Sequence, residues 1–223
     1  MTSAPDRSAA ADIAQLRALA YRALSATFLY PEDDRLAELT VAAPDLRAAA
    51  ERVWGWLVPG WTAVLDRLEL LTHEAAEDLR VEYTTLFLAG ARGRSCPPYK
   101  SFHIGAGPSE AGAAAAAVEA VYAAAGVAVG GAAEGELPDH IAVELDFLSY
   151  LCGQEADASD PERAAAWRRR QEAFLSEHLL RWLPAFERAL AAVMPDGFYR
   201  EAARAAREVT EHDSLLARAP SQT

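Results

Sequence analysis

The chain has 223 residues, of which 33 are acidic and 21 basic, so its net charge at neutral pH is −12. This charge disfavours binding to nucleic-acid backbones and to anionic membrane surfaces. Hydrophobic residues make up 52% of the chain, as in folded globular proteins, and no apolar run approaches the roughly 18 to 20 residues that a bilayer requires. Cys96 and Cys152 form no CxxC pair and no export signal is visible, which predicts a cytoplasmic protein with reduced thiols.

Helical periodicity runs through almost the whole chain, and the alternating pattern of strands is missing. Ile13, Leu16, Ala20 and Leu24, for example, form one apolar stripe, and Pro31 is expected to end that helix. We therefore predict an all-α fold, a single helical-bundle domain of about eight to ten helices over residues 1–223. The predicted helices cover residues 12–30, 33–42, 45–57, 62–71, 73–88, 109–125, 138–152, 161–177, 178–193 and 197–217.

Prolines and glycines set the predicted boundaries. Pro44 is expected to separate two helices, whereas Pro138 and Pro161 are expected at the first position of theirs, the latter with Asp160 as N-cap. Residues 89–107 contain glycines and two adjacent prolines, which predicts a long loop without regular helix, and residues 126–137 form a second glycine-rich break. The predicted domain thus has a helical part at 12–89, a loop at 90–107, a carboxy-terminal part at 108–217 and a flexible tail at 218–223. The tryptophans Trp54, Trp56 and Trp61 are expected to pack in the core.

The acidic residues are concentrated in the middle of the chain. Residues 101–162 contain eleven Asp and Glu but no Lys or Arg, which leaves 22 acids against 21 basic residues elsewhere. A cation-free stretch of this length predicts an electronegative surface that attracts a basic partner.

Motifs for chemistry are mostly missing. No Glu-x-x-His motif, P-loop or nucleophile elbow occurs. The segment 136–145 (ELPDHIAVEL) gathers acids and an imidazole where a helix is expected to begin, which fits either an ordinary helix start or a functional cluster. His140 and Glu144 share a helix face, so a helical metal-binding protein or metalloenzyme that also uses Glu136, with His73 as a further candidate ligand, is one alternative. A generic acidic helical adaptor is another.

Several stretches, taken together, resemble the TorD/DmsD/NarJ-type maturation chaperones, all-helical proteins that serve molybdenum enzymes of the dimethyl sulfoxide reductase superfamily. Residues 82–103 (EYTTLFLAGARGRSCPPYKSFH) are similar to the family's aromatic helix end and Pro-Pro-aromatic loop. Residues 136–148 (ELPDHIAVELDFL) are similar to its Glu-x-Pro-Asp-His hinge signature. Residues 178–186 (HLLRWLPAF) and 197–208 (GFYREAARAARE) follow in the family's order, and 21–32 fits its first helix.

The resemblance implies a cytoplasmic chaperone without catalytic residues, cofactor or metal site. Such a protein binds the twin-arginine leader, the body or both of an immature molybdenum enzyme, assists cofactor insertion and holds back export. The client-binding residues implied by position are Tyr83, Phe87, Pro98, Tyr99, Glu136, Pro138, Asp139, His140, Phe198 and Tyr199. The family often has tryptophan where this chain has Tyr83 and Tyr99, so the selectivity for peptides is expected to differ.

Carboxylates suit the arginine fork and aromatic faces suit an apolar segment, which agrees with this assignment. We expect Asp139→Ala and His140→Ala to weaken client maturation while leaving the fold intact. The identity of the client and any nucleotide binding stay open. Both a monomer and a domain-swapped dimer are compatible with the glycine-rich break.

Overall fold

The computed structural model describes residues 8–55, 58–88, 95–104 and 108–218. The regular elements of this part of the chain are all helical and no strand is formed in it, which confirms the predicted all-α fold. The α-helices are α1 (Ala9–Thr27), α2 (Asp33–Trp54), α3 (Pro59–Glu69), α4 (His73–Tyr83), α5 (Lys100–Ile104), α6 (Pro108–Ala124), α7 (Ile141–Ala156), α8 (Pro161–Phe174), α9 (Leu180–Val193) and α10 (Phe198–Arg218). Two π-helical segments, Thr84–Leu88 and Leu175–Leu179, extend α4 and join α8 to α9, and a short 3₁₀ turn covers Gly131–Ala133.

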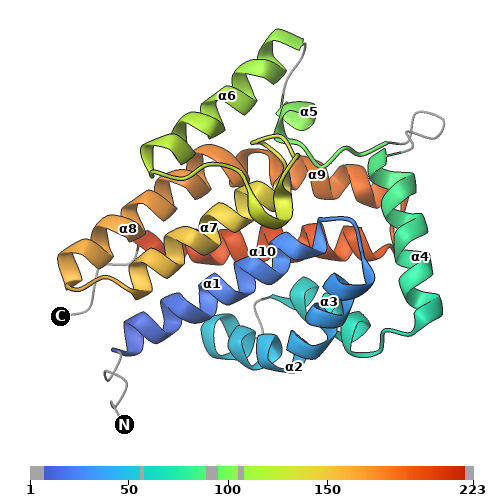
Figure 1. The fold of residues 1–223 in the computed structure, drawn as a ribbon, viewed down its shortest axis with the longest axis horizontal. Coiled ribbons are helices and arrows are strands. Elements are labelled where there is room, and N and C mark those ends of the chain that lie inside the picture. Colours follow the sequence, from blue (N-terminus) through green and yellow to red (C-terminus); the bar gives the residue numbers. More distant parts are fainter. Residues whose placement is uncertain (1–7, 56–57, 89–94, 105–107, 219–223) are drawn as a thin grey trace.

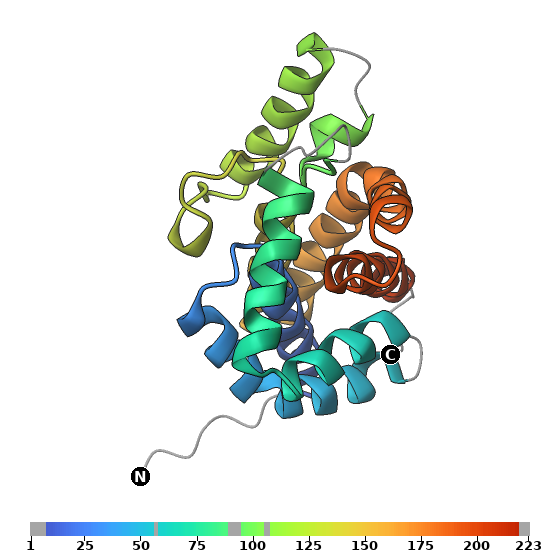
Figure 2. The same ribbon diagram turned by 90° about the vertical axis from the view of Figure 1, so that its right-hand side faces the viewer.

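The helices pack around a central pair. α1 and α7 lie side by side, α2 and α8 flank them, and α10 contacts α1, α3, α8 and α9 (Figure 1). α4 stands across one end of the bundle, and α6 projects from the upper side, where it contacts α5 (Figure 2). No described helix is long and apolar enough to cross a membrane.

The apolar stripes predicted from the sequence form one continuous core. α1 contributes Tyr21 and Leu24, and α9 contributes Trp182 and Phe186, all fully buried. Trp54 and Trp61 are buried as predicted, whereas Trp56 lies outside the described residues.

Three predicted boundaries are wrong. Pro44 lies inside α2, because the stripe Leu36, Leu39, Ala43, Leu46 and Ala50 stays buried on both sides of it and holds the helix together. Pro138 is not the first helical residue, since α7 begins at Ile141 with His140 as its N-cap. Part of the predicted loop is helical, because Asp139 accepts the first free N–H groups of α5.

The other boundaries agree more closely. The Asp160 side chain caps α8 by accepting from the Arg163 N–H at 2.8 Å, and Pro161 is the first helical residue. α10 continues to Arg218, and the rest of the predicted tail lies outside the described residues, as do residues 89–94 and 105–107 of the predicted loop.

Candidate functional site

Two segments that resemble the chaperone family meet through their backbones. The Lys100 N–H donates to the Asp139 carbonyl and the Ile141 N–H donates to the Pro98 carbonyl, both at 2.9 Å. This antiparallel bridge joins the Pro-Pro loop to the hinge, which we define as residues 136–140. It also sets the Tyr99 ring edge-on to the His140 ring, with 4.9 Å between ring centroids. Predicted site residues about 40 positions apart in the sequence therefore form one structural unit.

Asp139 and His140 are buried and act on backbone groups. Asp139 Oδ2 accepts the Ser101 N–H at 2.8 Å, and His140 Nδ1 accepts the Ala142 N–H at 3.1 Å. Burial lowers the pKa of His140 to about 4, although the Glu136 and Asp139 carboxylates favour its charged form. The imidazole is therefore neutral at pH 7, and its Nε2 carries the proton. Because both side chains hold helix ends in place, we expect their truncation to lower stability, and whether the fold stays intact remains a prediction.

Glu136 is the member of the hinge whose carboxylate reaches solvent. Its side chain is 29% exposed, and its Oε2 accepts the Tyr99 hydroxyl at 2.8 Å and lies 3.9 Å from His140 Nε2. Burial raises the pKa of Tyr99, and the hydrogen bond to Glu136 adds to that shift. The Tyr122 hydroxyl of α6 donates a hydrogen bond to the Pro138 carbonyl at 2.9 Å, which connects the hinge to α6.

The predicted aromatic residues form a closed cluster beside the hinge. The Tyr83 centroid lies 4.9 Å from that of Phe87 and 5.5 Å from that of Tyr199, which in turn packs against Phe198 at 5.2 Å. Burial raises the pKa of Tyr83 to about 12, and the negative charge of Glu136 contributes, so this cluster and the hinge are neighbours. All four rings are buried as folded. Their direct contact with a client stays a prediction.

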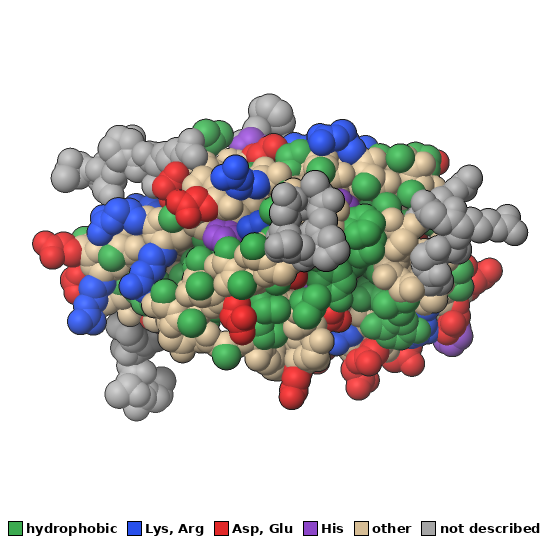
Figure 3. Space-filling view, turned by 90° about the horizontal axis from the view of Figure 1, so that it is seen from above, with side chains coloured by type: hydrophobic (Ala, Val, Ile, Leu, Met, Phe, Trp, Pro, Cys, Tyr) green, Lys and Arg blue, Asp and Glu red, His purple; other side chains and the backbone are tan. Residues whose placement is uncertain are grey.

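An exposed apolar surface lies next to this cluster and was not predicted. Tyr30 is 41% exposed and its ring packs on Tyr83 at 5.5 Å, while Leu137, which follows Glu136, is 55% exposed. Hydrophobic side chains gather in the right-hand half of the upper face of the molecule (Figure 3). We call Tyr30, Tyr99, Glu136 and Leu137 the hinge face. The position of Tyr30 directly before Pro31, shortly after α1 ends at Thr27, is the sequence signal that could have pointed to this surface.

The buried polar residues near α7 point in different directions. Glu144 accepts the Trp182 indole N–H at 3.2 Å, and burial raises its pKa above the usual range, against the attraction of Lys100. Lys100 Nζ donates to His178 Nδ1 at 2.7 Å. His140 instead faces Glu136, so the helix face shared by His140 and Glu144 forms no common site. Within the described residues, no three His, Cys, Asp or Glu side chains are grouped as a metal site requires.

The acids of residues 101–162 do not all reach the surface. Asp139, Glu144 and Glu155 are buried, and the last of these is paired with Arg17 at 3.1 Å and with Arg168 at 2.8 Å. The electronegative surface therefore carries fewer charges than the sequence predicts, because cations from outside the stretch neutralise acids inside the fold.

Comparison with known proteins identifies the family. Residues 54–188, more than half of the chain, match the model of the nitrate reductase delta subunit. The chain is 35% identical to the chaperone protein TorD of Aeromonas salmonicida (strain A449) over 136 residues, which cover 60% of this chain and 58% of the relative. It is 43% identical to the selenate reductase assembly chaperone protein of Thauera selenatis over 83 residues, 36% of this chain and 42% of the relative.

A third relative is the chlorate reductase assembly chaperone protein of Ideonella dechloratans, 43% identical over 60 residues, 26% of this chain and 31% of the relative. The chain thus spans less than two thirds of the length of these three relatives. All three are named as chaperones, not as catalysts, and no solved structure matches the chain. With the sequence motifs and the helical fold, the family match establishes that the chain belongs to the nitrate reductase delta subunit family, to which the TorD-type chaperones are related.

Proposed function

We propose that this protein is an assembly chaperone for a molybdenum enzyme of the dimethyl sulfoxide reductase superfamily. In this role it binds the twin-arginine leader, the body or both of the immature catalytic subunit, assists cofactor insertion and holds back export, and it catalyses no reaction itself. Family membership supports the proposal, as do relatives named as assembly chaperones of selenate and chlorate reductases.

The observation that carries the proposal is the position of Glu136 in the hinge face. Its carboxylate is partly exposed, is oriented by the Tyr99 hydroxyl, and is followed in the chain by the exposed Leu137. A carboxylate held in this way can accept two parallel hydrogen bonds from a guanidinium group. Such charge-assisted hydrogen bonds contribute about 1.5–3 kcal/mol each when water is excluded.

The exposed apolar side chains suit the part of a leader that follows its arginines. Tyr30 and Leu137 would lose solvent contact against an apolar segment, and burial contributes about 25 cal/mol per Å². Tyr99 is half-buried, and an aromatic ring can pack against either an arginine or an apolar side chain. The combination of one acid with several apolar groups favours a peptide that carries both kinds of residue.

Isothermal titration calorimetry at low salt tests the proposal directly. The full chain is titrated with synthetic twin-arginine leaders from several reductases, including one encoded beside the chaperone gene. We expect binding to at least one leader, and about tenfold weaker binding when its two arginines are replaced by lysines, because lysine lacks the bidentate fork. If no leader binds at low salt, leader recognition is refuted, and co-purification from the native host then tests binding to the enzyme body.

A matched pair of variants localises the interaction. Glu136→Gln keeps the size of the side chain and its hydrogen bond from Tyr99 but removes the charge, so we expect leader binding to weaken about tenfold. Glu38→Gln, an exposed residue of α2, removes the same charge elsewhere and serves as the control. Equal affinities of the two variants would remove the hinge face from leader recognition.

A further inference from the structure

A cavity of about 320 Å³ lies between residues 127–133 and α7. None of the predicted client-binding residues lines it. The segment that covers it connects the end of α6 to the hinge and stands out from the bundle (Figure 2). Gly126 and Gly131 have φ angles of 78° and 64°, which side chains rarely adopt, so the segment can turn sharply at both points. We call this space the arch cavity.

The walls of the arch cavity are apolar in character. They include Val129, Val143 and the rings of Tyr122, Phe147 and Tyr150. The Tyr122 hydroxyl donates to the Pro138 carbonyl at 2.9 Å and the Tyr150 hydroxyl donates to the Ala125 carbonyl at 3.4 Å. Both hydroxyls are thus engaged at the two ends of the covering segment and leave ring surface toward the cavity. An apolar side chain could enter without leaving a buried polar group unpaired.

One carboxylate lines the arch cavity. Asp146 lines the cavity, is exposed, and has no hydrogen bond or ion pair with another described residue, although the charge of Arg22 on α1 acts on it. Glu134 is exposed and follows Ala133, which also lines the cavity. No Lys or Arg is among the lining residues. A mostly apolar lining with one exposed carboxylate fits an apolar side chain that has a positive charge next to it in sequence.

We propose that the arch cavity is a second client subsite, which takes one bulky apolar side chain of the client peptide while a neighbouring arginine or lysine meets Asp146. The proposal rests on the proposed function and specifies where the apolar part of the client is held. A volume near 300 Å³ is the lower limit of ligand pockets, so the arch cavity suits a single side chain better than a drug-sized ligand. The Tyr122–Pro138 hydrogen bond connects this subsite to the hinge, two residues from Glu136.

Cavity-filling variants test the subsite. Ala133→Leu and Val129→Phe place larger side chains in the arch cavity, and each is expected to weaken binding of a leader that the wild-type chain binds by about tenfold. The matched control is Ala124→Leu, which adds the same group on the other side of α6, in a separate cavity of about 210 Å³. Thermal unfolding of each variant establishes that it is folded, and Val129→Phe keeps the test valid if Ala133→Leu fails to fold.

A peptide scan identifies the side chain that enters. Each apolar residue of the leader is replaced in turn by serine, and we expect one replacement to weaken binding to the wild-type chain but to have no further effect on the filled variants. Asp146→Asn is expected to reduce the dependence of binding on salt.

Two results overturn the subsite, and they are distinguishable. Folded, filled variants that bind the leader as tightly as the wild-type chain refute the arch cavity and leave binding at Glu136 in place. A wild-type chain that binds no leader refutes leader recognition and the subsite together.

Discussion

At the scale of single residues, the hinge depends on side chains that act on backbone groups. Asp139 is fully buried, and its Oδ2 accepts the Ser101 N–H while its carbonyl accepts the Lys100 N–H. The five-residue helix α5 is too short to be stable alone, so these hydrogen bonds fix its first turn and with it the position of Tyr99. Structural roles and proposed client-binding roles therefore fall on neighbouring residues.

Asp139→Ala is expected to lower the free energy of unfolding by about 1–3 kcal/mol, because it leaves the Ser101 N–H without its partner. Urea denaturation followed by circular dichroism measures the change. The control is Glu38→Ala at an exposed position, for which we expect a change within about 0.5 kcal/mol. If both variants are equally stable, the carboxylate does not hold α5.

His140 makes stability depend on pH. Its pKa is lowered to about 4 in the folded chain from about 6.5 in the unfolded chain, so between these values the unfolded chain binds the extra proton. The neutral His140 imidazole makes its full contribution to stability above pH 6.5. As the pH falls from there toward 4, the free energy of unfolding decreases by about 1.4 kcal/mol per pH unit. His140→Asn keeps an N-cap acceptor and does not titrate, so we expect a shallower loss of stability between pH 7 and 5.

Urea denaturation at pH 5, 6 and 7 measures this slope. His73→Asn, at an exposed helix start, removes no buried imidazole and is expected to keep the wild-type slope. A His140→Asn slope equal to that of the wild-type chain would show that the buried imidazole is not the group that takes up the proton.

The sequence brought Tyr99, Asp139 and His140 together as candidates but could not describe their surroundings. Tyr99, Asp139 and His140 were found because their motifs occur in the order typical of a family. Their burial follows from the backbone bridge between residues 98–100 and 139–141, and such long-range pairing has no periodic pattern in the sequence. The same bridge buries the Asp139 and His140 side chains, whereas the Glu136 carboxylate reaches solvent.

At the scale of elements, long periodic segments were predictable and proline positions were less so. Pro44 was expected to end a helix, but it occupies an exposed position of α2 while the buried stripe of that helix continues past it. Pro138 was expected to open α7, but His140 supplies the cap two residues later. Tertiary packing and side-chain capping outweigh the local preference at both positions.

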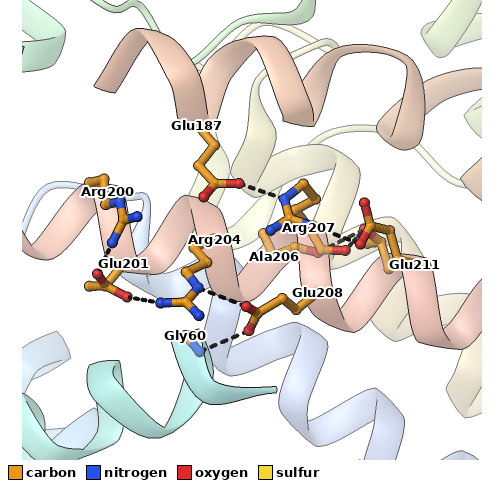
Figure 4. Close-up of polar contacts among 10 residues, drawn as sticks. Gly60, Glu187, Arg200, Glu201, Arg204, Ala206, Arg207, Glu208 and Glu211 are labelled. Carbon is orange, nitrogen blue, oxygen red and sulfur yellow. Dashed lines mark hydrogen bonds and ion pairs between the residues drawn. The ribbon is translucent and has the colours of Figure 1, made fainter. Parts of the chain in front are cut away.

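The contact between α3 and α10 depends on a glycine. The Gly60 N–H donates to Glu208 Oε2 at 2.8 Å, and Arg204 holds the other oxygen of that carboxylate at 2.7 Å (Figure 4). A Cβ at position 60 would lie 2.8 Å from the backbone nitrogen of Ala205, closer than real contacts allow. The two helices can therefore approach only when residue 60 has no side chain.

Gly60→Ala is expected to destabilise the chain by about 1–3 kcal/mol, because α3 must move away from α10. The matched control is Gly112→Ala in α6, where nothing lies within 4 Å of the added methyl group and a gain of about 0.5–1 kcal/mol is expected. Thermal unfolding of both variants measures the difference. An increase in stability for Gly60→Ala would contradict the close approach of the two helices.

At the scale of the whole molecule, charge balance in the sequence was a poor guide to charge on the surface. Residues 101–162 lack cations, yet Arg17 and Arg168 pair with Glu155, and Lys100 acts on Glu144. These cations come from elsewhere in the chain and reach the acids only through the fold. Acids near the surface, such as Glu136 and Asp146, are the part of the predicted negative charge that a client could meet.

One buried arginine joins distant parts of the chain. Arg17 of α1 binds Asp213 of α10 at 2.8 Å, Glu155 of α7 at 3.1 Å and Gln171 of α8 at 2.7 Å. The Trp54 indole of α2 donates to the other oxygen of Asp213 at 2.9 Å. Five helices from both ends of the chain therefore share one polar network inside the core.

Arg17→Met replaces the guanidinium by an apolar side chain of similar length. It leaves Asp213 buried without its cation and leaves Glu155 paired with Arg168 alone. Removing one partner of a buried ion pair costs about 3–5 kcal/mol, so we expect a loss of this size in urea denaturation. Arg47→Met is the control, because its partners Asp66 and Glu69 are at the surface and the expected loss is below about 1 kcal/mol. Similar losses for the two variants would show that the Arg17 network does not hold the two ends of the chain together.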